Sequence, residues 1–582
     1  MPTGASMRLM FASALAGMLC IGNAIADETV RFVIHDRTLH RVDPRLFGQF
    51  MERPSWGETG PEAALVPGTN ALQLSVLKLL KEMKIPILRF PGGTDVDFLD
   101  WRDMVSNVPG RSPERPISKG HLGHEVTNRF GYDEFLQLCE QLGAEAILVV
   151  NFRDGLLGKR PLKEAAQRAA ELVAYCNAPV GAKLPAGMPD WPSIRAKNGR
   201  KKPYGVKYWQ IGNETWFFLD NDMSSMSLEE RTKRYVECLA AYVKAMREVD
   251  PSIRFIIDGL GSTKKTADLA RKELGDAISH FALHCYMPWA IREIKKEDGS
   301  VVPFDKLTQE EIWNTWVAMP GMDASGLAHF EMWEIDAARQ EGVKLAMTEW
   351  NWNGWWHIVE GGPHPPLDSC WAKGIGAAGF LHALMRAGDV IEIGCQSMLV
   401  GARWGITAIR SDPTGKIHAY YMPTGQITAF YRRHHGDRLL ELHSSGVPTY
   451  EQPYQMSGIR PYKRVALIDA LATRSDRSIF FHAINRSFNR AIDVEIDLSN
   501  FGAISAKATH HLIEGRLNDH PREGEPRQVA RESSRALTIN GSILKVTLPA
   551  RSVNCVEVDI LGKTLAFPPT PDRQVIDPPL SY

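Results

Sequence analysis

The sequence has no excess of charge of either sign, because 68 Lys and Arg residues balance 68 Asp and Glu residues. Without a basic field to attract a polyanion, nucleic-acid binding is not expected. The chain has 582 residues, of which 44% are hydrophobic and 23% charged. This composition is that of globular domains and excludes disordered or collagen-like chains, and the length predicts two or three folded units.

Long apolar runs are also missing, except for one near the N-terminus. It covers residues 9–21, follows an arginine and ends in small residues at Ala24–Ala26. A run shorter than about 20 residues is too short to span a bilayer, so it predicts a signal peptide over residues 1–26. We therefore expect an exported protein that begins at Asp27 and has no membrane association after cleavage. A membrane anchor and a lipid-modified Cys20 are the alternatives.

Cysteine is scarce, and its spacing fits neither a disulfide framework nor a metal site. The chain has eight cysteines and no Cys-x-x-Cys, and the seven beyond the signal peptide are widely spaced. The pairs His434–His435 and His510–His511 lack partners at the spacing of metal ligands. The one Gly-x-Gly-x-x-Gly match, at residues 374–379, lies inside a helical pattern and indicates close helix packing. No metal or organic cofactor is expected.

Residues 44–430 alternate between short apolar runs and helical patterns, which is typical of βα units around a parallel sheet. Eight such runs predict a (β/α)8 TIM barrel with insertions. The expected strands are 46–51, 85–90, 145–152, 206–211, 254–257, 278–285, 344–348 and 390–396, and the clearest helices are 71–84, 132–142, 162–176, 228–249 and 371–387.

After residue 430 the pattern changes to alternating strands with few helices. It predicts a C-terminal antiparallel β-sandwich over residues 431–562, which a strand in residues 27–43 joins. The Pro-rich tail at 563–582 is expected to be loosely held. The expected strands are 465–471, 477–485, 491–498, 506–512, 543–548 and 552–560, and the polar stretches 183–203 and 295–311 are interpreted as insertions.

Active sites of such barrels lie at the C-terminal ends of the strands, so polar residues at these ends are candidates. Carboxylates, amides and a phenol among tryptophans suit a neutral sugar, which stacks its apolar faces and hydrogen-bonds its rims. About half of the tryptophans are expected to be core residues instead. The strand-end residues are Glu52, Thr94, Asn151, Asn213, Glu214, Asp258, His284, Tyr286, Glu349 and Gln396, and the tryptophans are Trp209, Trp216, Trp289, Trp350, Trp352, Trp355 and Trp356.

Glu214 and Glu349 stand out because each ends an apolar strand, where an ionised carboxylate is costly unless it faces a cleft. Cleaving a glycosidic bond requires a proton donor and a second carboxylate at the anomeric carbon, and this pair supplies both. Glu214 alone also fits a surface ion pair, and Asn213–Thr215 is a formal glycosylation sequon. Their joint placement favours a glycosidase.

Several strings resemble one known family. They are Leu46–Glu52, Arg89–Gly93 followed by Trp101–Asp103, Asn128–Phe135, Gly212–Glu214 and Thr348–Trp350. Together and in this order they resemble glycoside hydrolase family 51, the α-L-arabinofuranosidases of clan A. The resemblance covers nearly the whole mature chain.

The resemblance implies a role for each matching residue. Glu214 corresponds to the general acid/base, Glu349 to the nucleophile, and Asn213 to the group that binds the hydroxyl next to the anomeric carbon. Arg89 would keep the nucleophile ionised, with a barrel-interior ion pair as the alternative. The remaining matches are Glu52, Tyr286 and Gln396 as pocket-lining residues, with Tyr286 as a packed aromatic and His284 as a satisfied core histidine left open.

One departure is Thr94, where the family usually has the Asn of Pro-Gly-Gly-Asn. The change alters a hydrogen bond in the pocket, so it bears on the choice of sugar and not on the reaction. Asp95 and Asp97 either compensate or are solvated loop charges.

These features predict an exported, retaining, exo-acting α-L-arabinofuranosidase that acts on polysaccharide or oligosaccharide substrates. Another clan A glycosidase, such as an endo-glucanase or a galactofuranosidase, and a non-catalytic carbohydrate-binding protein are the alternatives. A homo-oligomer stays open.

Overall fold

Eight parallel strands close into a barrel, in the order β12-β14-β2-β3-β6-β7-β8-β9. Each overlaps one of the eight predicted runs, because parallel strands are buried on both faces and therefore read as continuous hydrophobic segments. The strands are β2 (Gly48–Phe50), β3 (Ile87–Phe90), β6 (Glu145–Val150), β7 (Tyr208–Ile211), β8 (Arg254–Ile257), β9 (Ile278–Met287), β12 (Leu345–Trp352) and β14 (Ile391–Ser397).

This computed structural model describes residues 29–258, 264–287, 290–291, 293–318, 332–352, 355–356, 371–456, 459–516, 519 and 530–561. The predicted signal peptide and the Pro-rich tail lie outside the described residues.

Side chains fill the interior of the barrel. Each strand contributes at least one buried residue to a shared cluster, to which β14 adds Cys395, and branched or aromatic side chains dominate it, as is usual for this fold. The core therefore leaves the mouth at the C-terminal ends of the strands as the place for a site. The eight residues are Phe50, Ile87, Ile147, Tyr208, Ile256, Ala282, Ala346 and Ile393.

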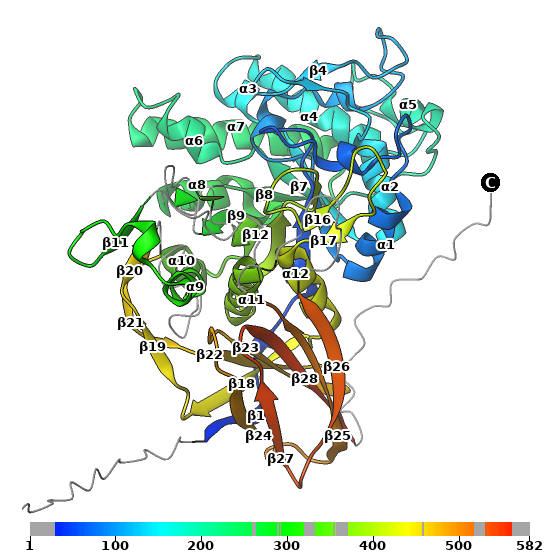
Figure 1. The fold of residues 1–582 in the computed structure, drawn as a ribbon. Coiled ribbons are helices and arrows are strands. Elements are labelled where there is room, and N and C mark those ends of the chain that lie inside the picture. Colours follow the sequence, from blue (N-terminus) through cyan, green and yellow to red (C-terminus); the bar gives the residue numbers. More distant parts are fainter. Residues whose placement is uncertain are drawn as a thin grey trace, which may run out of the picture.

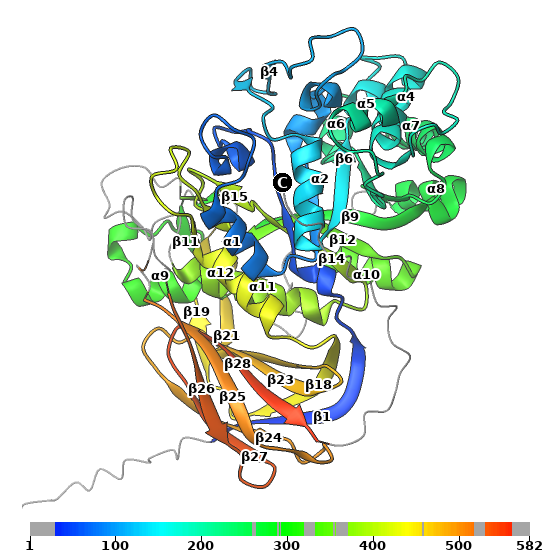
Figure 2. The same ribbon diagram turned by 90° about the vertical axis from the view of Figure 1, so that its right-hand side faces the viewer.

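Helices surround the barrel, and Figure 2 shows α1 and α2 along its outer face. The longest, α7, begins with a capping box in which Ser227 and Glu230 satisfy each other's backbone N–H groups. The helices are α1 (Leu74–Met83), α2 (Tyr132–Leu142), α3 (Arg153–Leu156), α4 (Leu162–Asn177), α5 (Trp191–Lys197), α6 (Thr215–Asp220), α7 (Leu228–Val249), α8 (Lys264–Leu274), α9 (Gln309–Trp316), α10 (Met332–Glu341), α11 (Trp371–Arg386) and α12 (Pro423–Arg433), with 3-10 helices η1 (Pro44–Phe47), η2 (Gly60–Ala64), η3 (Thr94–Phe98), η4 (Trp101–Met104), η5 (Gly275–Ala277) and η6 (Phe304–Lys306).

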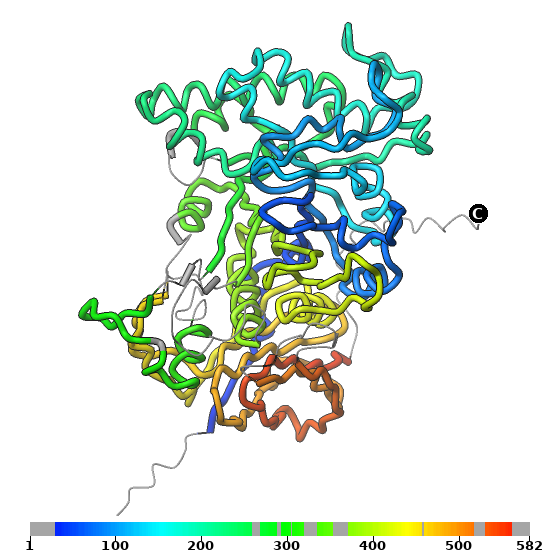
Figure 3. Tube along the Cα trace, turned by 45° about the horizontal axis from the view of Figure 1, so that its top comes forward, coloured from blue at the N-terminus to red at the C-terminus, as the bar shows by residue number. Residues whose placement is uncertain are grey.

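A second sheet of nine strands lies below the barrel (Figure 1), in the order β26-β25-β28-β23-β22-β18-β1-β24-β27. All its pairs are antiparallel except β1 with β24. Figure 3 shows its orange and red strands wrapped into a rounded group. The predicted barrel followed by a C-terminal antiparallel β-structure is confirmed. The strands are β1 (Val30–Arg41), β18 (Arg438–Ser445), β22 (Ile468–Arg474), β23 (Ser478–Asn485), β24 (Ile492–Asp497), β25 (Ile504–Glu514), β26 (Arg531–Thr538), β27 (Ile543–Leu548) and β28 (Ser552–Ile560).

The sequence missed part of this sheet. The expected strand 465–471 is in fact divided between β21 (Tyr462–Ala466), which pairs with β19 (Thr449–Gln452), and β22. Strands β18 and β26 were not predicted, because most of their residues are polar and partly exposed. The other short strands are β4 (Ser118–Lys119), β5 (Glu125–Val126), β10 (Ala290–Ile291), β11 (Ile294–Lys296), β13 (Trp355–Trp356), β15 (Val400–Gly401), β16 (Ile409–Arg410), β17 (Tyr420–Tyr421) and β20 (Tyr454–Met456).

Helices α11 and α12 lie between the barrel and the sheet (Figure 1). Residues 371–385 of α11 are all buried, which explains why this helix is apolar on every side. Its Gly376 packs against Trp352, and an added Cβ would lie 1.9 Å from that ring. The glycine pattern in α11 therefore serves helix packing.

Candidate active site

Glu349 lies within β12, three residues before its last residue, and not after the strand as predicted. The pairing register with β9 shifts between Met347 and Glu349, which is the signature of a β-bulge. A bulge interrupts the alternation of side chains. It allows Thr348 and Glu349, although adjacent, both to approach His284 of β9.

Three groups fix the Glu349 carboxylate. Arg89 Nη1 donates to Oε1 at 2.8 Å, and the Tyr286 hydroxyl donates to Oε2 at 2.7 Å. Burial alone would raise the pKa of Glu349, but His284, Arg89 and the Tyr286 hydrogen bond outweigh it and lower the pKa below its ordinary value. Glu349 is therefore ionised and ready to act as a nucleophile.

Arg89 connects the two strands that carry the candidate carboxylates. Besides Glu349, its guanidinium donates to Gln210 Oε1 at 2.7 Å and to Asn213 Oδ1 at 2.6 Å. It also stacks over the Phe50 ring, with 4.5 Å from the guanidinium carbon to the ring centroid. Arg89 is completely buried. Arg89 thus forms an ion pair in the barrel interior, and its partner in that pair is the candidate nucleophile Glu349.

Glu214 lies three residues beyond the end of β7, as the N-cap of α6, and has a left-handed backbone, with φ of 48°. For a residue with a side chain this conformation costs about 1–2 kcal/mol, so the surroundings hold it there. Its side chain is 36% exposed, against 8% for Glu349. One carboxylate is therefore open to solvent and the other enclosed.

His284 lies between the two glutamates. Its Nδ1 is 3.0 Å from Glu214 Oε1 and 3.7 Å from Glu349 Oε2, and its Nε2 is 2.9 Å from Thr348 Oγ1. Burial lowers the pKa of His284, but the negative charges of Glu349 and Glu214 outweigh it and raise the pKa. A ring nitrogen of His284 and one carboxylate oxygen each of Glu214 and Glu349 all lie within 4.8 Å of one another.

Glu52 lies beside the same cluster of side chains, against Gly92 and Gly93. A Cβ at Gly93 would be 2.6 Å from Glu52 Oε1 and 3.6 Å from Glu349 Oε1, so only glycine leaves this space open. Burial, followed by the charges of Glu349 and Asp95, raises the pKa of Glu52 well above its ordinary value. A neutral carboxyl group here could donate a hydrogen bond to a sugar hydroxyl.

The other predicted residues lie further from this cluster or serve the framework. Gln396 is completely buried and bonds Gln49, Thr428 and Thr424. Thr94 begins η3 and is partly exposed. Asn151 Oδ1 accepts the backbone N–H of Asp154 in the first turn of α3, and Asp258 accepts hydrogen bonds from the backbone N–H and hydroxyl of Thr215, next to Glu214.

Asp95 and Asp97 are not solvated loop charges, because both are completely buried. Asp95 pairs with Arg53 and His121. Asp97 accepts three backbone N–H groups, from residues 152, 153 and 213, at 2.8–3.1 Å. Burial raises its pKa to about 6 despite these bonds. Asp97 therefore ties the ends of β6 and β7 together beside the site.

Four of the seven candidate tryptophans have described side chains, and three of these four are core residues. Trp209, Trp350 and Trp352 are completely buried core residues, whereas Trp216 packs edge-on against the His284 ring at 5.4 Å between centroids. The side chains of Trp289, Trp355 and Trp356 lie outside the described residues.

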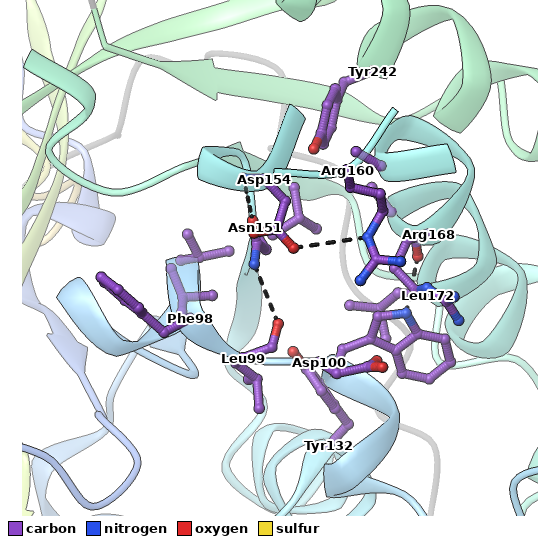
Figure 4. A pocket seen from close by; sticks show the side chains of 16 residues that line it. Phe98, Leu99, Asp100, Tyr132, Asn151, Asp154, Arg160, Arg168, Leu172 and Tyr242 are labelled. Atoms are coloured by element: carbon purple, nitrogen blue, oxygen red, sulfur yellow. Dashed lines mark hydrogen bonds and ion pairs between the residues drawn. The ribbon is translucent and has the colours of Figure 1, made fainter. Parts of the chain in front are cut away.

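A separate cavity of about 160 Å³ lies beyond the end of β6 (Figure 4). Some of its polar groups are paired within the protein, such as Arg160 with Asp154 at 3.7 Å and Asn151 with the Leu99 carbonyl at 3.4 Å. Neither catalytic candidate lines it.

The structure brings together three residues of metal-ligand type that sequence spacing did not reveal. His434, His511 and Glu557 have ligand atoms within 4.8 Å of one another. The two imidazole rings are stacked, however, with centroids 3.9 Å apart and 24° between planes. A bound metal must lie in the plane of each ring, so this arrangement favours stacking over coordination.

No helix in the described part of the chain is both long and apolar enough to cross a membrane.

Comparisons with known proteins find similarity to α-L-arabinofuranosidases. Residues 79–291 match the model of the alpha-L-arabinofuranosidase 1 domain, and residues 349–552 match that of the alpha-L-arabinofuranosidase C-terminal domain. Alpha-L-arabinofuranosidase C of Emericella nidulans is 35% identical over 230 residues, which are 38% of this chain and 40% of that protein. The chain thus aligns with less than half the length of this relative.

Two further matches extend over most of the chain. The intracellular exo-alpha-(1->5)-L-arabinofuranosidase of Streptomyces lividans is 26% identical over 501 residues, covering 81% of this chain and 66% of that protein. The GH51 alpha-L-arabinofuranosidase structure from Thermotoga petrophila has the same fold, with a TM-score of 0.66 at 24% identity, covering 91% of this chain and all of that one. With both domain models matched in order, the chain belongs to glycoside hydrolase family 51, the α-L-arabinofuranosidase family.

Proposed function

We propose that the protein is a retaining, exo-acting α-L-arabinofuranosidase that releases terminal arabinofuranose from polysaccharides or oligosaccharides. The observation that carries this proposal is the pair Glu214 and Glu349, which have oxygen atoms within 4.8 Å of each other. Retaining glycosidases place their two carboxyl groups about 5–5.5 Å apart, whereas inverting enzymes need about 6.5–9.5 Å to admit water.

The environments of the two carboxylates fit different roles. Glu349 is enclosed and kept ionised by Arg89 and Tyr286, so it attacks the anomeric carbon and forms a covalent glycosyl-enzyme. Glu214 is more exposed and next to His284, so it protonates the leaving oxygen and later takes a proton from the attacking water. The bond to the leaving group breaks as the bond to Glu349 forms. In the second step the water oxygen bonds to the anomeric carbon as the bond to Glu349 breaks, and Glu214 takes the water's proton.

Family membership supports arabinofuranose as the sugar, and the name of the Streptomyces lividans relative supports exo action. In the pocket, Asn213 and neutral Glu52 would hydrogen-bond the hydroxyls of the terminal unit. We also propose that the protein is exported, on the strength of the predicted signal peptide.

The experiment is an assay with 4-nitrophenyl α-L-arabinofuranoside. The wild-type protein should release nitrophenol, and Glu349→Ala should abolish release while keeping the fold. A panel of other aryl glycosides distinguishes the alternatives, because faster cleavage of a galactofuranoside or a glucoside would identify a different glycosidase. No cleavage of any member would favour a non-catalytic carbohydrate-binding protein.

A further inference from the structure

Exposed aromatic side chains gather at the mouth of the barrel. Of the large hydrophobic side chains exposed in the described residues, the aromatic ones are Trp56 (49%), Phe98 (42%) and Phe217 (58%). Each follows a barrel strand, β2, β3 and β7 respectively. Exposed apolar surface that collects on one face of a protein usually marks a binding surface.

The backbone of Trp56 has a strained conformation that lowers the stability of the fold. Trp56 is the second residue of a tight turn in which Ser55 and Glu58 exchange backbone hydrogen bonds of 2.8 and 3.0 Å. Its φ is 51°, a left-handed value that costs a residue with a side chain about 1–2 kcal/mol. A strained and exposed tryptophan indicates a functional role.

The turn is anchored to the site on two sides. Ser55 donates to Glu52 at 3.1 Å, and Glu52 lies beside Glu349. The carboxylate of Glu58 accepts the backbone N–H groups of residues 402, 403 and 404, each at 2.7 Å, in the segment after β14. Trp56 is therefore carried on a fixed support next to the pocket.

His121 connects Trp56 with Phe98. Its ring centroid is 4.5 Å from that of Trp56 and 6.0 Å from that of Phe98. Asp95 holds His121 through its ring nitrogen at 3.0 Å and its backbone N–H at 2.6 Å, and Arg53 pairs with Asp95 at 3.0 Å. This buried pair fixes His121, whose side chain is only 5% exposed, and His121 in turn supports the exposed rings of Trp56 and Phe98 as a preorganised surface.

We infer that the exposed rings of Trp56 and Phe98, bridged by the largely buried ring of His121, form a platform on which a sugar unit outside the catalytic site stacks. The inference rests on the proposed function. Because an exo-acting enzyme holds one unit in its pocket, a sugar on this platform belongs to the leaving group. Sugar rings present C–H faces that pack on aromatic rings, so the platform selects neutral oligosaccharide chains over small aryl glycosides.

The experiment compares kcat/KM for a linear arabino-oligosaccharide and for 4-nitrophenyl α-L-arabinofuranoside. Trp56→Ala should lower the value for the oligosaccharide about tenfold, mainly through KM, and change that for the aryl substrate less than about twofold. Phe98→Ala should act in the same direction. Leu122→Ala is the matched control, because Leu122 is 60% exposed next to His121 and is not part of the platform.

Equal losses on both substrates, or no loss on either, would overturn the inference. If the wild-type protein does not cleave the aryl substrate, the proposed function fails separately. The platform is then tested by calorimetric titration with arabino-, xylo- and cello-oligosaccharides, and unchanged binding in Trp56→Ala overturns it. A change only in oligomeric state, measured by analytical ultracentrifugation, would instead identify the rings as a contact between copies of the chain and also overturn it.

Discussion

The hydroxyl of Tyr286 donates a hydrogen bond of 2.7 Å to Oε2 of Glu349, on the opposite carboxylate oxygen from Arg89. Both donors stabilise the ionised form, and together with His284 they offset the cost of burying it. The charge on the candidate nucleophile is thus set by its neighbours and not by exposure to solvent.

Replacing Tyr286 with Phe should shift the pH profile. Losing this hydrogen bond raises the pKa of Glu349, so the acidic limb of kcat/KM should move to higher pH by about one unit, and activity below the optimum should fall. The check is the pH dependence of aryl arabinofuranoside hydrolysis. Tyr421→Phe, which removes a buried hydroxyl bonded to the Leu79 carbonyl, should leave the limb in place. An unmoved limb in Tyr286→Phe would contradict this account of Glu349.

Asp97 should make stability depend on pH. Its pKa of about 6 in the folded protein exceeds the ordinary value of 3.8, because the carboxyl is buried. The folded state then binds the proton more tightly than the unfolded state, so stability is lost as pH rises from about 4 through 6, by on the order of 3 kcal/mol.

The variant Asp97→Asn tests this assignment. It should reduce that pH dependence in urea unfolding, and it should lower kcat because its amide opposes the N–H of Asn213. The same pH dependence in the variant and the wild type would show that Asp97 does not titrate in this range.

Thr94 should make the protein less selective between arabinofuranosides and related sugars. A pocket that hydrogen-bonds a hydroxyl strongly rejects analogues without it, and losing one such contact weakens the discrimination. Thr94→Asn should therefore increase the preference for arabinofuranosides over galactofuranosides and xylopyranosides, measured as ratios of kcat/KM. If the ranking and the ratios stay the same, position 94 does not determine specificity.

The mature protein should begin at Asp27 when the full sequence is expressed in an exporting host. N-terminal sequencing of the exported protein checks this. A protein that keeps Met1, or one that carries lipid on Cys20, would exclude cleavage before Asp27.

The barrel could be predicted from sequence because each strand is a short apolar run, as in Ile147–Val150 of β6. Parts of the nine-stranded sheet were harder to predict. One example is β26, which has the sequence Arg-Glu-Ser-Ser-Arg-Ala-Leu-Thr and few buried positions. Backbone pairing with β25 holds β26 in the sheet, because the side chains of β26 bury little apolar surface.

The charged residues at strand ends were accessible to sequence reasoning, but their supports were not. Glu58 bonds backbone groups more than 340 positions later in the chain, and no local pattern predicts such a contact. Asp95 and Asp97 follow the Pro-Gly-Gly turn and read as loop charges, although the fold buries both. The bulge that turns Glu349 inward likewise depends on pairing with β9 and not on the sequence of β12.

The most direct test of the mechanism is the anomeric configuration of the first product. With Glu349 as nucleophile and Glu214 as acid/base, two displacements occur at the anomeric carbon, so α-configured arabinofuranose should appear first from an α-arabinofuranoside in a proton NMR time course. Mutarotation should add the β-anomer and the pyranose forms only later. A first product of β-configuration would show a single displacement by water and would contradict the assignment of Glu349 as the nucleophile.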